Sequence, residues 1–383
     1  MQSKVVQKKL VSNNLETVLD DWDLGRSLPS FVYTSEEIFS LELERIFYSK
    51  WLAVCHSSQL KNKGDIRVQQ IGSKSIVLVR GQDDVIRAFY NVCRHRGARL
   101  LGESKNAKVI QCRYHGWTYR LDGTLAGCPD MQDYQDFDLE KYCLYKVQID
   151  FWGGFVWINL DPHPESLFSY LGDFCDKFQK YKMEELQWVT SVGRYNVKAN
   201  WKTIMENANE CYHCPTVHPE TLGPYYRQVV PYDEESVKGP YVFIVWKEYT
   251  KSTGNAVDIA TQQLGGRSLD LDESQSTAMP FPTVFPTAQF VITPDWVASF
   301  IAWPKKIRET EVLIDLFFRR VPETEEEKEV AKYLDLVNSQ DFAITEVQQE
   351  GLNSGVFGGC EFNSLEKSVR HFQKMYMQSL KTL

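Results

Sequence analysis

Two short segments in the first half of the chain each hold a cysteine and a histidine at a spacing that could bind a metal. The segment "CRHRG" contains Cys93 and His95, and the segment "CRYHGW" contains Cys112 and His115. Each segment follows a β-like apolar run and enters a glycine-containing loop, so the two loops can converge on one ion or one cluster. Two thiolates and two imidazoles could bind zinc tetrahedrally, or a 2Fe-2S cluster in which two histidines replace two cysteines on one iron.

The spacing of these four residues favours the cluster. Each loop supplies one cysteine and one histidine, whereas zinc modules of the Cys2His2 type usually pair cysteine with cysteine and histidine with histidine. In the cluster one iron takes both thiolates and the other takes both imidazoles, so each loop spans both irons. Such a cluster has a reduction potential of roughly −150 to +300 mV and transfers single electrons. A zinc site in a structural protein remains the alternative.

The segment "NECYHCPTVHP" offers a second group of ligands. A helical pattern over residues 200–214 predicts that Glu210 and His213, three residues apart, share one helix face. On an unbroken helix His218 would point about 140° away from His213. Pro215 lacks an N–H group and clashes with the preceding turn, so we expect it to break the helix just past His213 and to let His218 turn back.

The same segment contains Cys211 and Cys214 in a Cys-x2-Cys arrangement, which is also found in zinc sites and redox dithiols. Soft thiolates would be poor ligands for an iron that activates oxygen, so we interpret both cysteines as small apolar groups that only pack. The chain has nine cysteines, an odd number, and no recognisable secretory signal. These features argue against a disulfide framework.

An oxygen ligand for the two histidines is expected further along the chain. Thr324 and Glu327 form a capping box at the start of a long predicted helix, and Asp341 lies on its apolar stripe. The stripe consists of Val330, Leu334, Val337, Asp341, Ile344 and Val347. A carboxylate on a buried stripe is destabilising unless it is paired or bound to a metal. The residue is therefore either a hydrogen-bonded acid at the edge of the stripe or, with His213 and His218, part of a two-histidine, one-carboxylate set for non-haem Fe(II).

The elements that carry these ligands change in character near residue 165. Residues 40–165 read as short strands and turns, including a hairpin with Asp122 and Gly123 at its turn, and predict an all-β domain. Residues 166–383 mix helices with aromatic strands and predict an α+β domain, on which residues 1–39 are expected to pack. The helical pattern of this second domain covers residues 168–187, its strand-like runs cover 240–247, 287–303 and 311–319, and residues 250–277 read as a loop.

The composition argues against two classes of partner. The chain has 383 residues and a formal net charge of −8, and it lacks the clustered Lys and Arg residues that nucleic-acid binding needs. No run of about 18 apolar residues offers a membrane span, and the N-terminal segment lacks the apolar core of a secretory signal. We therefore expect a soluble, cytoplasmic protein that binds neither nucleic acid nor membranes.

In this order and spacing, the two ligand motifs resemble those of the catalytic (alpha) subunit of the Rieske non-haem iron oxygenases. The resemblance covers residues from about 30 to 375. It implies an α+β fold in which an all-β Rieske iron-sulfur domain is inserted in or joined to a helix-grip (START-like) catalytic domain with an antiparallel sheet and flanking helices. It also implies a homotrimer. By resemblance, the 2Fe-2S cluster is bound by Cys93, His95, Cys112 and His115, and the mononuclear iron is bound by His213, His218 and Asp341, the last assigned from "QDFAITEVQQEG".

Glu210 matches the acid that, in this family, connects the iron site of one subunit to a cluster histidine of its neighbour. Arene dioxygenases usually have aspartate there, and the glutamate in "ECYHC" is closer to the carnitine, choline and glycine betaine monooxygenases. The resemblance thus implies an O2-dependent hydroxylation of a C–H bond next to nitrogen in a quaternary ammonium or betaine-like substrate, with demethylation or C–N cleavage. The alternatives are an aromatic-ring hydroxylating oxygenase and a Rieske electron-transfer protein without oxygen chemistry.

Aromatic side chains between residues 225 and 303 could bind such a cation through their ring faces. These candidates are Tyr225, Tyr226, Tyr241, Phe243, Trp246, Phe290, Trp296, Phe300 and Trp303. The alternative for most of them is packing in the core of a sheet. No G-x-G-x-x-G motif follows a strand, so the sequence predicts that electrons come from a separate NAD(P)H-dependent flavin or iron-sulfur reductase.

Overall fold

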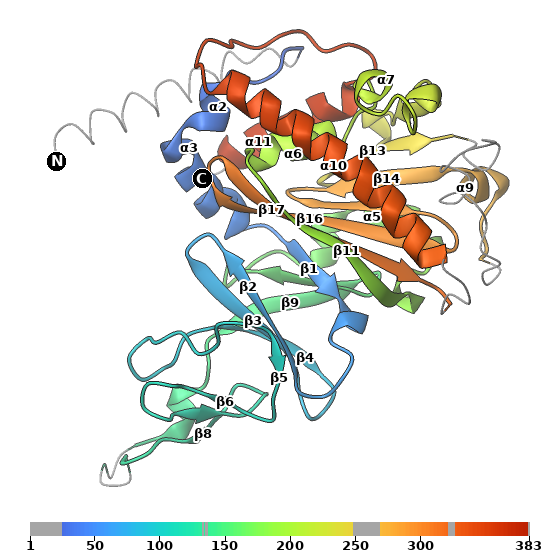
Figure 1. The fold of residues 1–383 in the computed structure, drawn as a ribbon. Coiled ribbons are helices and arrows are strands. Elements are labelled where there is room, and N and C mark those ends of the chain that lie inside the picture. The colour runs from blue at the N-terminus through green and yellow to red at the C-terminus, as the bar shows by residue number, and fades with distance from the viewer. Residues whose placement is uncertain (1–24, 132–133, 135–136, 248–268, 321–325, 382–383) are drawn as a thin grey trace, which may run out of the picture. The chain divides into compact units, whose positions relative to one another are not determined.

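The computed structural model describes residues 25–131, 134, 137–247, 269–320 and 326–381 (Figure 1). The described chain divides into two compact units. One comprises residues 47–165, and the other combines residues 25–46 with residues 166–381. Each unit is built around its own seven-stranded antiparallel sheet.

The unit formed by residues 47–165 is all-β apart from short 3-10 turns, Ser57–Gln59 and Leu139–Tyr142. Its large sheet has the strand order β1-β10-β9-β4-β3-β2-β5. These strands are β1 (Leu52–His56), β2 (Asp65–Ile71), β3 (Lys74–Arg80), β4 (Ile86–Tyr90), β5 (Lys105–Asn106), β9 (Lys146–Trp152) and β10 (Phe155–Asn159). A second sheet contains β6 (Ile110–Gln111), β7 (Thr118–Tyr119) and β8 (Leu125–Gly127). Asp122 and Gly123 lie in the turn between β7 and β8, as the sequence predicts.

The sheet of the larger unit has the strand order β11-β17-β16-β15-β14-β13-β12, and helix α10 lies across one of its faces (Figure 1). The strands are β11 (Gln187–Val197), β12 (Val229–Pro231), β13 (Tyr241–Trp246), β14 (Met279–Val284), β15 (Ala288–Ile292), β16 (Trp296–Lys306) and β17 (Glu309–Phe318). The helices are α2 (Phe31–Thr34), α3 (Glu36–Glu42), α4 (Leu167–Leu171), α5 (Phe174–Phe178), α6 (Trp201–Asn207), α7 (Cys214–Val217), α9 (Glu273–Thr277), α10 (Glu326–Leu352) and α11 (Lys367–Lys381). A π-helical turn follows α3 (Leu43–Phe47), and 3-10 turns cover Gln179–Tyr181, Met183–Glu185, Gly223–Tyr225 and Glu234–Ser236.

The predicted fold class is confirmed: an all-β unit accompanies an α+β unit with an antiparallel sheet. The predicted helix over residues 168–187 consists instead of α4, α5 and two 3-10 turns. The loop predicted over residues 250–277 lies mostly outside the described residues, and its end forms α9. The sequence patterns did not indicate β11 or α11.

Candidate metal centres and the adjoining pocket

The four residues of the first ligand group lie in two turns of matching geometry. The amide of Gly97 donates to the carbonyl of Cys93, and the amide of Gly116 donates to the carbonyl of Cys112, each at 3.0 Å. Both glycines have a left-handed backbone, with φ of +72° and +71°. A side chain there would strain each turn. Glycine therefore lets each turn fold back on itself within the segment that holds its cysteine and histidine.

The cysteines and histidines of these turns have opposite exposure. Cys93 and Cys112 are buried in the core of the β unit, whereas His95 and His115 are exposed. The two imidazole rings lie 4.7 Å apart between centroids, and the His95 ring stacks on Trp117 at 4.8 Å. The group therefore has a thiol side that faces the core and an imidazole side that faces outward.

The exposure of this group favours a cluster over a single ion. A zinc ion holds four ligands tetrahedrally around one point. Here the two thiols are buried on one side and the two imidazoles are exposed on the other. This separation fits a two-iron cluster with both thiolates on one iron and both imidazoles on the other.

The second ligand group begins where α6 ends. Asn200 caps the helix through its side chain, which accepts from the amide of Lys202 at 3.0 Å, and the helix ends at Asn207. The prediction that Glu210 and His213 share one helix face was wrong, because both lie in the loop after α6. Their side chains nevertheless meet, with Glu210 Oε1 2.5 Å from His213 Nδ1.

Pro215 begins a helix rather than ending one. The short helix α7 starts at Cys214, with His213 at its N-cap and Pro215 in its first turn. Proline fits there because its missing N–H would have no partner inside the helix. The amide of His218 donates to the carbonyl of Cys214 at 2.9 Å, which ends the helix. This single turn places both imidazoles on one side of the loop.

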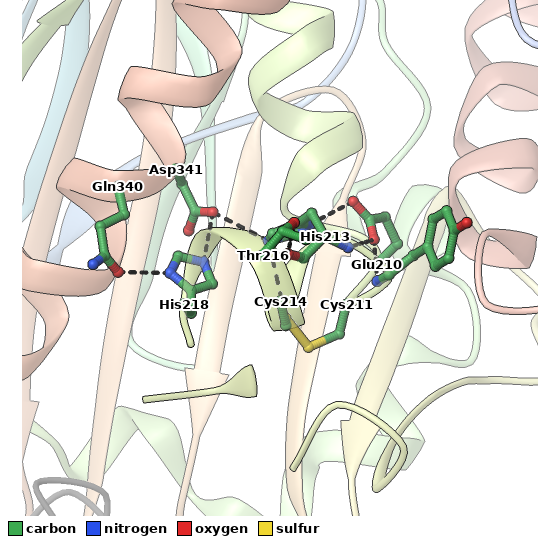
Figure 2. Close-up of a disulfide and its surroundings, with 9 residues drawn as sticks. Glu210, Cys211, His213, Cys214, Thr216, His218, Gln340 and Asp341 are labelled. Atoms are coloured by element: carbon green, nitrogen blue, oxygen red, sulfur yellow. Dashed lines mark hydrogen bonds and ion pairs between the residues drawn. A yellow bond between two sulfur atoms is a disulfide. The ribbon is translucent and has the colours of Figure 1, made fainter. Parts of the chain in front are cut away.

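The two imidazoles of this group converge on Asp341 of α10 (Figure 2). Asp341 Oδ1 lies 2.9 Å from His218 Nε2 and 3.2 Å from His213 Nε2. Two imidazole nitrogens and a carboxylate are the donor set of non-haem Fe(II) sites with open positions. The three side chains therefore have the chemistry and the proximity to bind one such ion.

The Nδ1 atom of each imidazole ring also has a hydrogen-bonding partner. His213 Nδ1 faces Glu210, and His218 Nδ1 lies 2.7 Å from Gln340 Oε1. When Nδ1 carries the proton, Nε2 presents its lone pair toward Asp341, as a metal ligand requires. Gln340 was not indicated by the sequence analysis, although it directly precedes Asp341. Its position beside a candidate ligand was the one available signal.

Protonation in this group follows from burial and hydrogen bonding. Burial lowers the pKa of His213, but the hydrogen bonds to Asp341 and Glu210 outweigh it and raise the pKa to about 10. Burial alone would raise the pKa of Asp341, but hydrogen bonds from His213 and His218 lower it. A metal ion that binds His213 must therefore displace a proton.

The apolar stripe of α10 was only partly as predicted. It is buried as far as Val337, but Ile344 and Val347 are 39% and 60% exposed. Two steps of three residues rotate these positions away from the face by about 60° each, because the helix has 3.6 residues per turn. Thr345 and Gln349, which follow Asp341 in steps of four, occupy the face instead. The predicted cap Thr324 lies outside the described residues.

The interpretation of Cys211 and Cys214 as unconnected packing residues was wrong. Both are buried, but a disulfide joins them around His213 (Figure 2). The amide of Cys214 also donates to the carbonyl of Cys211 at 3.2 Å, so the turn between them brings the two sulfurs together. Local turn geometry, rather than a framework of several bridges, accounts for this pair.

A cavity of about 120 Å³ adjoins the second ligand group. Side chains at alternate positions of the sheet line it, including Gln289 and Val291 of β15 and Trp296 and Phe300 of β16. Among the nine predicted aromatic candidates, those that line the cavity are Trp246, Trp296 and Phe300. Candidates at odd positions of β16 or β13, such as Trp303, lie on the opposite face. Phe281, Tyr333 and Phe342 also line it and were not predicted.

None of the helices in the described part of the chain has the length and hydropathy of a membrane span.

Each ligand group lies inside a region of the chain that matches a known domain family. Residues 50–142 match the Rieske [2Fe-2S] domain, and residues 182–382 match the ring hydroxylating alpha subunit (catalytic domain). The chain is 32% identical over 369 residues to the carnitine monooxygenase oxygenase subunit of Escherichia coli (strain K12), covering 93% of this chain and 94% of that protein. It is 28% identical to the glycine betaine monooxygenase oxygenase subunit of Pseudomonas aeruginosa, with 94% and 90% covered.

The fold also matches solved structures. A structure of the quaternary ammonium Rieske monooxygenase CntA in complex with its substrate L-carnitine superposes with a TM-score of 0.79 at 25% identity. The match covers 96% of this chain and 99% of that one.

Proposed function

The chain belongs to the Rieske non-haem iron oxygenases, as a ring-hydroxylating alpha subunit, and on this basis we propose that it is the oxygenase component of a quaternary ammonium monooxygenase. It would use O2 to hydroxylate a C–H bond next to nitrogen in a quaternary ammonium or betaine-like substrate. The product of such a hydroxylation breaks at its C–N bond into an aldehyde and an amine.

The observation that carries this proposal is the wall of the cavity beside His213 and Asp341. Trp246, Trp296 and Phe300 present aromatic rings there, and the ionisable acids among its described lining residues are Glu210 and Asp341. Aromatic faces and carboxylates both stabilise an alkylammonium cation that has left water, by about 0.5–2 kcal/mol per ring face. A trimethylammonium group is also apolar enough to pack against the remaining wall.

In this proposal, His213, His218 and Asp341 bind the mononuclear iron, and Cys93, His95, Cys112 and His115 bind the 2Fe-2S cluster. When bound, the cluster supplies single electrons and the iron supplies open positions at which O2 is reduced. The protein's own groups orient and enclose the site. Gln340 fixes the ring of His218, Glu210 fixes that of His213, and the apolar cavity excludes water from the substrate.

Glu210 has a second proposed role as the connection between subunits of a homotrimer. Its Oε1 contacts the ring of His213, and its Oε2 accepts from the backbone amides of Tyr212 and His213. A carboxylate has about four lone-pair directions, so these bonds leave room for one more donor, a cluster histidine of the neighbour.

Electrons would come from a separate NAD(P)H-dependent reductase, and the proposed location of the reaction is the cytoplasm.

The proposal is tested by reconstituting both metal centres and supplying a surrogate reductase, NAD(P)H and O2. Carnitine, γ-butyrobetaine, glycine betaine and choline are compared with aromatic acids, and aldehydes and hydroxylated products are measured. The matched control is 3,3-dimethyl-1-butanol, a neutral isostere of choline. We expect product from one of the ammonium compounds and none from a neutral isostere. Hydroxylated aromatic acids without amine oxidation would contradict the proposal.

A further inference from the structure

The disulfide between Cys211 and Cys214 encloses the candidate ligand His213. Both sulfurs are buried, and both cysteines line the cavity beside His213 and Asp341. Figure 2 shows the bridge beside Glu210 and His213, and Cys214 is the first residue of α7. A change in the bond between these sulfurs would therefore occur inside the candidate iron site.

The sulfur of Cys214 lies on the metal side of His213. It is 3.9 Å from Nε2, the nitrogen that faces Asp341, whereas Nδ1 faces Glu210. A histidine nitrogen and a thiolate on one metal, with bonds of about 2.1 and 2.3 Å, lie about 3.1 Å apart at a right angle and at most about 4.4 Å apart. The observed separation falls inside this range, so the sulfur and Nε2 are spaced as two ligands of one metal can be.

The oxidation state of this sulfur decides whether it can bind a metal. A thiolate is a strong, soft ligand, whereas a sulfur in a disulfide has no charge to offer. The bond to Cys211 therefore removes the Cys214 sulfur from the donors around His213, His218 and Asp341.

We propose that Cys214 is a latent ligand of the mononuclear centre, which the disulfide to Cys211 withholds and which reduction of that bond releases to the metal. This inference rests on the proposed iron site. It adds a fourth protein donor that binds the metal in one redox state of the chain.

The release is a thiol–disulfide exchange with a dithiol reductant. One reductant thiolate attacks a sulfur of the bridge, which breaks the Cys211–Cys214 bond and forms a mixed disulfide. The second reductant thiol displaces the protein sulfur and leaves as a cyclic disulfide. The reductant is oxidised by two electrons, and its two protons end on Cys211 and Cys214. Binding of Cys214 to the metal then releases one proton to solvent.

A sulfur donor would occupy one of the positions that O2 and substrate need. The reduced protein should therefore bind divalent metal more tightly and oxidise substrate more slowly than the disulfide form. Oxidation of the dithiol would restore the open site, so the pair would make the enzyme sensitive to its redox surroundings.

The inference is tested with Co²⁺ as the probe, because cobalt bound to thiolate has a charge-transfer band in the near ultraviolet. The full chain is prepared with its 2Fe-2S cluster loaded, so that Cys93 and Cys112 are already bound, and with the mononuclear site free of iron. Co²⁺ is added anaerobically before and after treatment with a dithiol that is then removed, and the spectrum without cobalt is subtracted. We expect no sulfur–cobalt band in the untreated protein and a band after reduction. Cys211→Ser should show the band without reductant, because Cys214 is then free. Cys214→Ser should show it in neither state, and Cys175→Ser, a matched control elsewhere in this unit, should behave like the unaltered protein.

Contradicting results are distinguishable from failure of the iron site itself. If cobalt binds the untreated protein but neither the reduced protein nor Cys211→Ser shows a sulfur band, Cys214 is not a ligand and this inference is wrong. Mass analysis of the native chain that finds Cys211 and Cys214 unlinked would also overturn it. If His218→Ala does not lower cobalt affinity, the proposed centre is wrong and this inference is wrong with it.

Discussion

At the scale of single residues, the candidate iron site depends on where two ring protons lie. Glu210 and Gln340 each face the Nδ1 of a histidine, so both histidines direct Nε2 toward Asp341. Without such acceptors a neutral imidazole can place its proton on either nitrogen, and the wrong tautomer cannot bind a metal there. The outer acceptors are therefore part of the ligand set.

Gln340→Ala is expected to lower the affinity for Fe²⁺ or Co²⁺ by about 10–100-fold, because His218 Nδ1 loses its acceptor. Metal titration by calorimetry measures this effect. Gln340→Glu keeps an acceptor at the same place and should retain most of the affinity. An Ala variant that binds metal as tightly as the unaltered chain would show that Gln340 does not orient His218.

Trp296→Leu tests the cation site at the same scale. The substitution keeps an apolar side chain but removes a ring face from the cavity, so KM for an ammonium substrate should rise about 2–30-fold, which corresponds to roughly 0.5–2 kcal/mol. Steady-state kinetics with the reconstituted enzyme measures this effect, and Trp296→Phe, which keeps a ring, should lie between the two. An equal rise in KM for Trp296→Leu and Trp296→Phe would argue against a ring–cation contact.

Much of the site at residue scale could be predicted from sequence, since metal ligands have few possible residue types and restrictive spacings. His213, His218 and Asp341 could be predicted as ligands from the sequence, and the structure brings their ligand atoms within 4.8 Å of one another. Gln340 and Tyr333 escaped it, because an amide or a phenol has no spacing that distinguishes it from an ordinary helix residue. The disulfide escaped it too, because Cys-x2-Cys is compatible with packing, metal binding and bonding.

At the scale of elements, α6 is held by a buried polar network that joins it to α2, α3 and α11. The Lys202 ammonium lies 2.5 Å from Glu42 Oε1 and within 5.5 Å of the rings of three aromatic residues. Glu206, one turn further, accepts from Tyr33 at 2.9 Å and from Gln373 at 2.9 Å. Because α6 leads directly into the loop of Glu210 and His213, this network fixes the start of the candidate site.

Glu206 should make stability depend on pH. Burial raises its pKa to about 7, although hydrogen bonds from Gln373 and Tyr33 and the nearby Lys202 charge oppose the shift. The folded chain therefore binds a proton that the unfolded chain, with a pKa of about 4.3, releases. The stabilisation of the folded chain by this bound proton is fully present below the unfolded pKa and is lost as pH rises through about 7.

Glu206→Gln, which cannot ionise, should remove this loss. Between pH 5 and pH 8 we expect the free energy of unfolding of the unaltered chain to fall by up to roughly 3 kcal/mol more than that of the variant. Denaturant unfolding at both pH values measures the difference. The partly exposed Glu234, replaced in the same way, serves as the control and should not reproduce it. Parallel pH profiles for Glu206→Gln and the unaltered chain would mean that Glu206 stays protonated or stays ionised throughout.

Elements were predicted from sequence where a pattern is long and regular, as for β13, β17 and the run over residues 287–303, which the structure divides into β15 and β16. The break near His213 was predicted, but its form was not. Proline is unfavourable inside a helix and favourable in a first turn, and the sequence alone does not say which applies to Pro215. On α10, the last positions of the predicted stripe follow one another in steps of three residues. Each such step turns a little away from the buried face of the helix, and the deviation adds up with each turn.

At the scale of the whole molecule, each compact unit carries one candidate redox centre. The proposed function requires electrons to pass from a cluster to an iron, and the proposed trimer places that transfer between subunits. The trimer could be predicted only from family resemblance, because neither composition nor the contacts within one chain specify a partner.

Mixing two inactive variants tests the transfer between subunits. Cys112→Ser removes the cluster, and Asp341→Asn removes an iron ligand, so each homotrimer should be inactive. Co-expressed in equal amounts, the chains should recover roughly a quarter of the normal rate per chain, since half of them keep the iron and half of those have the right neighbour in a cyclic trimer. No recovery, with mixed trimers shown by mass spectrometry, would mean that electrons pass within one chain.

Glu210→Gln examines the same path without removing a metal. Both centres should still load, because an amide oxygen can face His213 Nδ1, but reduction of the iron site by the cluster should slow. Single-turnover absorbance with a pre-reduced cluster measures that rate. A rate equal to that of the unaltered chain would exclude Glu210 as the connection.

The matching turns at Cys93 and Cys112 have a consequence for the order of events in turnover. Their thiols lie in the core of the β unit, and their imidazoles are exposed. Electrons can thus approach such a cluster closely from one side only. In the proposed trimer, the reductase and the neighbouring subunit's iron site would then use the same small face. If trimer assembly covers that face, each electron has to arrive over a longer distance or during a transient opening, and the supply of electrons would limit the rate of the enzyme.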